Sequence, residues 1–175
     1  MKRVQDYLRD GLDVVFVGIN PGTRSAATGH HYAGPGNHFW PLLHESGLVT
    51  EPLTHEQDAR VLEWGIGLTN IVSRPSPGMS DLSLQELRAG ARTLRRKLLA
   101  LRPRIVCFNG KGIYEVFAGH KCELGLQAER IGDAAVYVMP CTSARAAAYR
   151  RADKLRYFRE LQRLTRGAAT RAVAS

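Results

Sequence analysis

The chain has 175 residues and is 44% hydrophobic, which suffices for one domain with a single full core. No apolar run approaches the roughly 20 residues of a membrane-spanning helix, and residues 1–7 lack the apolar core of a signal peptide, so we expect a cytoplasmic protein, associated with the nucleoid if bacterial. The net charge of +9 favours a polyanionic partner, with nucleic acid ahead of an anionic membrane surface, and three widely spaced cysteines argue against a disulfide scaffold or a four-cysteine metal site.

Short apolar, β-branched runs and amphipathic segments alternate along the chain. In chain order they predict a strand at 12–19, helices at 39–46 and 55–64, a strand at 67–72, a helix at 84–101, a strand at 104–109, a helix at 110–118, a strand at 135–139 and a helix at 147–166. Thr54 and Ser83 each begin a capping box that opens a helix. This alternation predicts an α/β fold, a single three-layer domain over 1–166 with a short, mostly parallel central sheet flanked by helices, while 167–175 are expected to form a flexible tail.

Two polar segments follow predicted strands, where an α/β sheet usually forms its ligand crevice. The first is GINPG at 18–22, which leads into GHHYAGPGNHFW at 29–40, and the second is MPCTSAR at 139–145. Taken alone, Asn20 and the two residues after it predict only a turn. From Cys141 onward, nine basic residues stand against two acidic ones, which fits either a nucleic-acid contact or an ordinary arginine-rich helix face exposed to solvent.

Taken together, these blocks resemble the thymine-DNA glycosylase and mismatch-specific uracil-DNA glycosylase family, within the uracil-DNA glycosylase superfamily. The similarity extends through GLTN at 67–70, PG at 77–78 with DLS at 81–83, and FNGK at 108–111, and covers residues 12–164. It is closer to the thymine-DNA glycosylases, because the chain lacks the Asn-Pro-Ser-Gly-Leu-Ser-Arg motif typical of the mismatch-specific uracil enzymes. The resemblance implies the uracil-DNA glycosylase fold and no cofactor, and the spacing of histidines and cysteines predicts no metal site.

The resemblance places Asn20 at the catalytic position of the family. A carboxamide has no accessible protonation near neutral pH and is no general base, but its carbonyl oxygen can orient a water while its NH₂ group donates to the substrate. We therefore expect a slow enzyme that depends on positioning and on a labile leaving group. Asp81 is a second candidate for catalysis because it could supply the missing carboxylate, although its place before the Ser83 capping box equally predicts a helix-terminal role.

The expected base pocket combines backbone amides, one aromatic ring and small polar side chains. Tyr32 is the candidate for stacking on the flipped base, and backbone amides near Gly18 and Ile19 are candidates for donating to a base oxygen. The rest of the predicted pocket consists of Ser25, His31 and Asn70. The alternatives are a core aromatic for Tyr32 and a strand-end turn for Asn70, and the roles of the adjacent histidines at 30 and 31 stay open.

The second motif is the candidate for entering DNA. Arg145 is expected to fill the space that the flipped nucleotide leaves and to bond the orphaned guanine, with an ion-paired residue at the start of the last helix as the alternative. Pro140 is expected to stiffen the loop, and Thr142 and Ser143 are expected to bind compressed phosphates. Ala144 belongs to the same expected DNA-binding segment. Lys111 opens a helix between two glycines and is a candidate phosphate contact.

We therefore expect a monomeric, monofunctional DNA glycosylase that acts on double-stranded DNA. It should flip uracil mispaired with guanine and hydrolyse its glycosidic bond, which starts base excision repair. Thymine or another modified pyrimidine opposite guanine is a further expected substrate. Two alternatives stay open, namely a catalytically weak protein of the same fold that binds mismatched or damaged DNA, and an α/β enzyme that acts on a small nucleotide through the glycines around Lys111.

Overall fold

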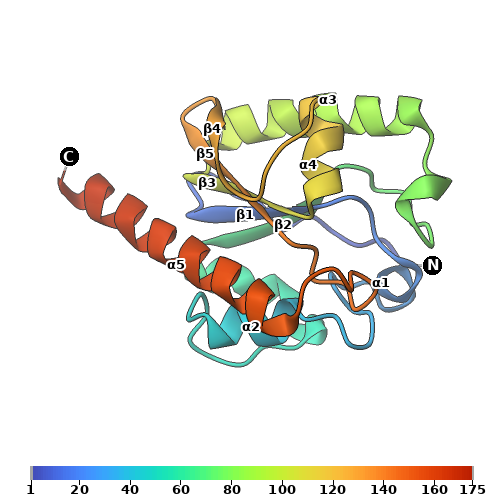
Figure 1. The fold of residues 1–175 in the computed structure, drawn as a ribbon, viewed down its shortest axis with the longest axis horizontal. Helices are drawn as coiled ribbons and strands as arrows, with labels where there is room; N and C mark the ends of the chain where they lie inside the picture. The colour runs from blue at the N-terminus through green and yellow to red at the C-terminus, as the bar shows by residue number, and fades with distance from the viewer. Residues whose placement is uncertain (1, 175) are drawn as a thin grey trace.

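A five-stranded sheet forms the middle layer of the molecule (Figure 1). The structure, a computed structural model, describes the backbone of residues 2–174 and side chains as far as residue 167. The strands run in the order β2 (Ile66–Asn70), β1 (Val14–Gly18), β3 (Ile105–Asn109), β5 (Ala134–Met139) and β4 (Gly125–Ile131). The first four are parallel, and β4 pairs with β5 in the antiparallel sense at one edge.

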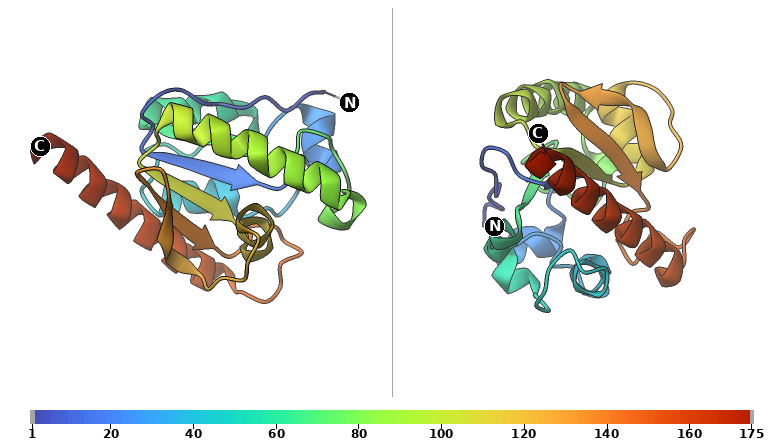
Figure 2. Two further views of the ribbon diagram at one scale, coloured as in Figure 1. Left: turned by 90° about the horizontal axis from the view of Figure 1, so that it is seen from above. Right: turned by 90° about the vertical axis from the view of Figure 1, so that its left-hand side faces the viewer.

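Helices cover both faces of this sheet (Figures 1 and 2). One face is covered by α3 (Leu84–Leu101) and α4 (Lys111–Ala118). The other is covered by α2 (Phe39–Glu45), the 3-10 helix η1 (His55–Trp64) and α5 (Arg151–Ala174). Two shorter elements, α1 (Thr23–Thr28) and the 3-10 turn η2 (Met79–Asp81), lie in connecting segments.

Strands β1, β3 and β5 carry apolar side chains on both faces. In β1, Val17 belongs to the core cluster that contains Leu94 of α3, whereas Phe16 packs against Phe39 of α2 at 5.1 Å and Phe158 of α5 at 6.1 Å between ring centroids. A sheet buried on both sides needs continuous apolar strands, which is why these strands read as unbroken apolar runs. The predicted three-layer α/β fold is therefore confirmed. No helix among the described residues is long and apolar enough to span a membrane.

The order of the strands places the site. Strands β2 and β3 lie on the two sides of β1. The connection from β1 to β2 contains α2 and η1, and the connection from β2 to β3 contains α3. A reversal of this kind is a topological switch point, where the carboxyl ends of neighbouring parallel strands leave a crevice. In this chain the reversal lies between β1 and β3.

The last helix differs from its predicted range. It begins at Arg151 rather than at residue 147, because the carboxylate of Asp153 accepts from the backbone N–H of Arg150 at 3.2 Å and so caps the helix there. It continues to Ala174, past the predicted end at residue 166. The predicted tail, 167–175, falls almost wholly outside the residues whose side chains the structure describes.

Two other segments also differ from their predictions. Residues 55–64 form a 3-10 helix rather than an α-helix, with Gln57 (φ −107°, ψ 20°) interrupting it and the charged Asp58 on its buried side. Strand β4 was not predicted, because only its end residues Gly125 and Ile131 are buried and an exposed edge strand shows no apolar run.

Candidate active site

The carboxyl ends of β1, β2 and β3 and the segment after β5 border a cavity of about 440 Å³. Most of the predicted site residues line it, namely Gly18, Ile19, Asn20, Ser25, His31, Tyr32, Asn70, Thr142, Ser143, Ala144 and Arg145. The two motifs therefore meet at the switch point although they lie far apart in the sequence. None of the described residues that line this cavity is Asp or Glu, so it holds no carboxylate that could act as a general base.

The carboxamide of Asn20 is held in one orientation. Its Nδ2 donates to the carbonyl oxygen of Arg74 and to Oγ of Ser76, both at 2.8 Å. The Arg74 carbonyl can only accept, and the Ser76 hydroxyl already donates to the carbonyl of Gly78 at 2.7 Å. Both amide hydrogens of Asn20 are therefore used, and Oδ1 is the atom left for a water. The structure therefore gives no support to the expectation that this NH₂ group donates to the substrate.

Tyr32 forms a fixed wall of the cavity. Its backbone adopts φ 52°, in the left-handed region that non-glycine residues rarely occupy, and its ring stacks on Phe39 with centroids 4.0 Å apart and 25° between planes. Burial raises the pKa of the Tyr32 phenol, which also has a hydrogen bond with Asn109. Beside it, a Cβ added to Gly18 would lie only 2.5 Å from Oδ1 of Asn70, so a larger residue at position 18 would have to displace the Asn70 side chain. The pocket wall is thus preorganised.

The adjacent histidines hold the loop that carries Tyr32. The carboxylate of Asp58, which is 1% exposed, accepts from the backbone N–H of His31 at 2.9 Å and pairs with Nδ1 of His30 at 3.0 Å. Burial lowers the pKa of His31, so its ring is neutral and Nε2 donates to the carbonyl of Gln5 at 2.6 Å. His31 lines the cavity, but both of these contacts serve to position the backbone.

Two further contacts fasten the same loop. Oγ of Ser25 accepts from the backbone N–H of Ala33 at 3.2 Å, and Nε1 of Trp40 donates to the carbonyl of His31 at 3.1 Å. Oδ1 of Asn37 accepts from the backbone N–H of Phe39 at 3.0 Å and so caps α2. Ser25 therefore contributes to the cavity through the shape of its wall.

The second motif is clamped at its buried half. Thr142, 1% exposed, receives a hydrogen bond at Oγ1 from Nδ2 of Asn109 at 2.9 Å and donates its backbone N–H to Oδ1 of the same Asn109 at 3.0 Å. The backbone N–H of His38 donates to the Thr142 carbonyl at 2.9 Å. Arg145 lies exposed at the rim of the cavity, and within the described part of the chain no carboxylate pairs with it. The ion-paired alternative for Arg145 thus finds no support.

Three predicted residues do not line the cavity. Asp81 is exposed, and its Oδ2 accepts from the backbone N–H of Gly78 at 3.0 Å, which closes the turn η2. This geometry fits the structural reading of Asp81. Lys111 is exposed as the first residue of α4, and Pro140 is buried behind the loop.

Sequence reasoning missed two polar residues of the site. Ser76 is 5% exposed and orients Asn20, but it lies between two prolines in a segment that predicts only a loop. Asn109 is 2% exposed and joins β3 to the second motif. It ends a strand as Asn70 does, so the rule that placed Asn70 at the crevice would also have found Asn109.

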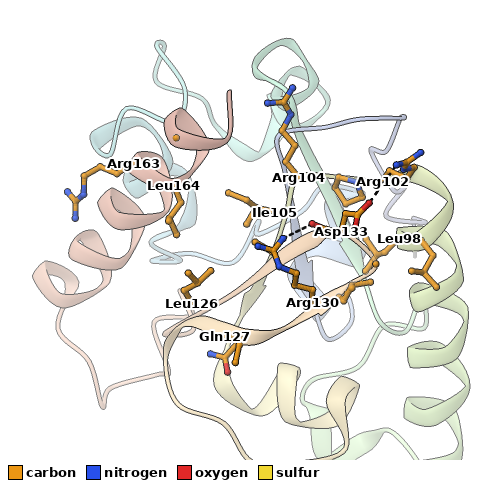
Figure 3. Close-up of a pocket in the computed structure, with 18 residues that line it drawn as sticks. Leu98, Arg102, Arg104, Ile105, Leu126, Gln127, Arg130, Asp133, Arg163 and Leu164 are labelled. Atoms are coloured by element: carbon orange, nitrogen blue, oxygen red, sulfur yellow. Dashed lines mark hydrogen bonds and ion pairs between the residues drawn. The ribbon is translucent and has the colours of Figure 1, made fainter. Parts of the chain in front are cut away.

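A larger cavity, of about 860 Å³, lies at the opposite ends of the parallel strands, where β3 and β5 begin (Figure 3). It is bordered by the end of α3, the β4–β5 hairpin and α5. Two arginines of this cavity interact with Asp133. The side chain of Asp133 forms an ion pair with Arg102 at 3.7 Å, and Arg130 donates a hydrogen bond to the backbone carbonyl of Asp133 at 2.9 Å. None of the predicted site residues lines this cavity, so the smaller one is the candidate active site.

Comparisons with known proteins show the family of the chain. Residues 5–164 match the family model described as the uracil DNA glycosylase superfamily. The chain is 37% identical over 160 residues to a G/U mismatch-specific uracil DNA glycosylase of Schizosaccharomyces pombe, a match that covers 85% of this chain and 49% of the relative. The chain therefore spans about half the length of that relative. A putative uracil DNA glycosylase from Methanosarcina acetivorans, solved by solution NMR, shares the fold with a TM-score of 0.58 at 21% identity, over 92% of this chain and 98% of that one.

Proposed function

Because the chain belongs to the uracil DNA glycosylase superfamily, we propose that it is a monofunctional DNA glycosylase. It flips uracil mispaired with guanine out of duplex DNA and hydrolyses the glycosidic bond, which leaves an abasic site for base excision repair. The observation that carries this proposal is the fixed carboxamide of Asn20, whose Oδ1 is left for a water in a cavity walled by Tyr32 and the loop 141–145. The name of the S. pombe relative supports uracil opposite guanine as the substrate.

The proposed reaction breaks the bond between the sugar C1′ and the base N1. The bonding electrons leave with the uracil anion, and the oxocarbenium-like sugar is captured by the water that Oδ1 of Asn20 orients. That water loses its proton to solvent after it has bonded to C1′, so no general base is needed in the cavity. Backbone amides near Gly18 and Ile19 donate to an oxygen of the leaving base. Since positioning and the stability of the leaving anion carry the reaction, we expect a slow enzyme.

The proposed DNA contacts lie around the rim. Arg145 enters the base stack as a wedge and bonds the orphaned guanine, and Ser143 binds a compressed phosphate. Lys111 and the exposed arginines of α5 contact phosphates farther along the duplex. We further propose that the protein acts as a monomer and that thymine opposite guanine is a weaker substrate. An unstable base pair lowers the cost of flipping in both cases.

A cleavage panel tests this function. Duplexes with uracil opposite guanine, thymine opposite guanine or uracil opposite adenine, together with single-stranded uracil DNA, are incubated with the protein and heated in alkali to cut abasic sites. We expect product with uracil opposite guanine, less with thymine, and none with Asn20→Ala. Tight binding to the mismatched duplex without any product would show a binding protein instead of an enzyme.

A further inference from the structure

A lysine is buried at the start of α5. Lys154 is 1% exposed and ranks among the largest fully buried side chains of the protein. Its Nζ lies 3.3 Å from the carbonyl oxygen of Ser143 and 3.3 Å from Nδ1 of His38. Among the described residues no carboxylate forms an ion pair with it, so its hydrogen-bond partners are a backbone carbonyl and an imidazole ring.

This position is unfavourable for a charge. The free energy needed to remove an ammonium group from water is much larger than the free energy gained from hydrogen bonds to neutral groups. Buried charges are therefore normally paired with an opposite charge. The first turns of a helix carry the positive end of its dipole, which repels a cation. Burial and the neighbouring Lys154 lower the pKa of His38, so its ring stays neutral and Nδ1 can accept from the lysine. An apolar side chain of similar length would fill the space at a lower cost.

One of the two hydrogen bonds of Lys154 reaches the turn that carries Arg145. The carbonyl of Ser143 accepts from both Nζ of Lys154 and the backbone N–H of Ala146, the latter at 3.0 Å, and Oγ of Ser143 accepts from the backbone N–H of Arg145 at 3.2 Å. Residues 143–146 thus form a turn with Arg145 inside it. Asn109 clamps the residue before this turn, and among the described side chains Lys154 is the one that hydrogen-bonds the turn from the body of the protein.

We propose that Lys154 is a positioning residue for the wedge, which holds the Ser143 carbonyl so that the 143–146 turn presents Arg145 to the DNA. With 1% exposure the ammonium group touches neither phosphate nor base, so it acts through the loop alone. This inference rests on the proposed function and deepens it. Lys154 should matter where a base pair must be opened and should not matter for the chemistry in the pocket.

The test replaces Lys154 by Met, which keeps the length of the side chain and removes its charge and donors. Lys97→Met is the matched control, since Lys97 pairs with Asp6 on the exposed surface. Two readouts are compared. The first is the single-turnover rate on uracil opposite guanine against the rate on single-stranded uracil DNA. The second is the fluorescence of 2-aminopurine beside a non-cleavable 2′-fluoro-deoxyuridine opposite guanine, which rises when the stack is opened.

For Lys154→Met we expect the duplex rate to fall about tenfold or more, because a hydrogen bond to a charged group is lost. The single-strand rate and the melting temperature should stay near the wild type, the fluorescence rise should shrink, and Lys97→Met should match the wild type. His38→Phe removes the ring acceptor of Lys154 and should shift the duplex rate in the same direction if Lys154→Met fails to fold. Unchanged duplex rate and fluorescence, or equal losses on both substrates, would overturn the inference. A wild type without activity or signal on any substrate would instead refute the proposed function.

Discussion

Replacing Ser76 by Ala probes the proposed catalytic geometry most directly. The substitution removes the Oγ that accepts from Asn20 Nδ2 at 2.8 Å and donates to the Gly78 carbonyl at 2.7 Å. Each such hydrogen bond contributes about 0.5–1.5 kcal/mol net, so the two together stabilise the fold by about 1–3 kcal/mol. For a chain of this size, about 2–4 °C of melting temperature is lost per kcal/mol, and we therefore expect a decrease of about 2–12 °C.

The effect on catalysis should be larger than the effect on stability suggests. In Ser76→Ala, Asn20 keeps its bond to the Arg74 carbonyl, so its Oδ1 still faces the cavity but is less well fixed. A displacement of this kind is expected to lower kcat about 10- to 100-fold. KM should change little, because the bond that is lost holds Asn20 and not the DNA.

The assay is single-turnover base release from uracil opposite guanine, with affinity for the duplex measured separately. Ser76→Thr keeps the hydroxyl and should restore most of the rate. Ser73→Ala is the matched control, since Ser73 is an exposed serine of the same loop. A Ser76→Ala variant that loses stability but keeps the wild-type kcat would refute the view that Ser76 orients the catalytic carboxamide.

Four further outcomes are expected. Asn20→Ala should abolish base release while affinity for the mismatched duplex stays near that of the wild type, measured by fluorescence anisotropy; normal turnover would move the chemistry elsewhere. Arg145→Ala should reduce release from duplex DNA much more than from single strands, and an equal loss on both would argue against a wedge. Asp81→Asn should keep most of the activity, because the carboxylate closes an exposed turn outside the cavity; a loss as large as that of Asn20→Ala would make Asp81 catalytic. Burial lowers the pKa of His31 below about 6.5, so the unfolded chain takes up this proton first and stability falls as the pH drops through that value, by at most about 1.4 kcal/mol per pH unit. His31→Gln should therefore lose less free energy of unfolding than the wild type between about pH 7.5 and pH 5.5 in urea titrations, whereas an equal loss would contradict the assignment.

The sequence predicted the parts of the fold whose signal is local. Strands β1, β3 and β5 are continuous apolar runs because both of their faces are buried, and the capping box at Ser83 marks the start of α3 with hydrogen bonds between Ser83 and Glu86. Strand β4 gave no such signal, because an edge strand keeps most of its side chains in water. The extent of α5 was missed since its cap depends on one carboxylate, that of Asp153.

The residues of the site were predictable where the motif carries them and not where tertiary contacts do. Asn20, Tyr32 and Arg145 stand in blocks that resemble a known family, and all three line the cavity. The orientation of the Asn20 carboxamide depends on Ser76, more than 50 positions away, and no sequence pattern joins the two. In the sequence Lys154 is one of many basic residues of the last helix, and only its burial in the structure distinguishes it from the exposed arginines around it.

The clamp between Asn109 and Thr142 has a consequence for how such an enzyme can evolve. It ties the buried half of the loop to the sheet, whereas Ala144 and Arg145 remain exposed beyond it. Substitutions at Thr142 must disturb the core, but substitutions at 144 and 145 change little that the fold depends on. Under the proposed function, selection can therefore alter the contact with the opposite strand at these two positions with little effect on the fold, while the proposed base pocket stays as it is.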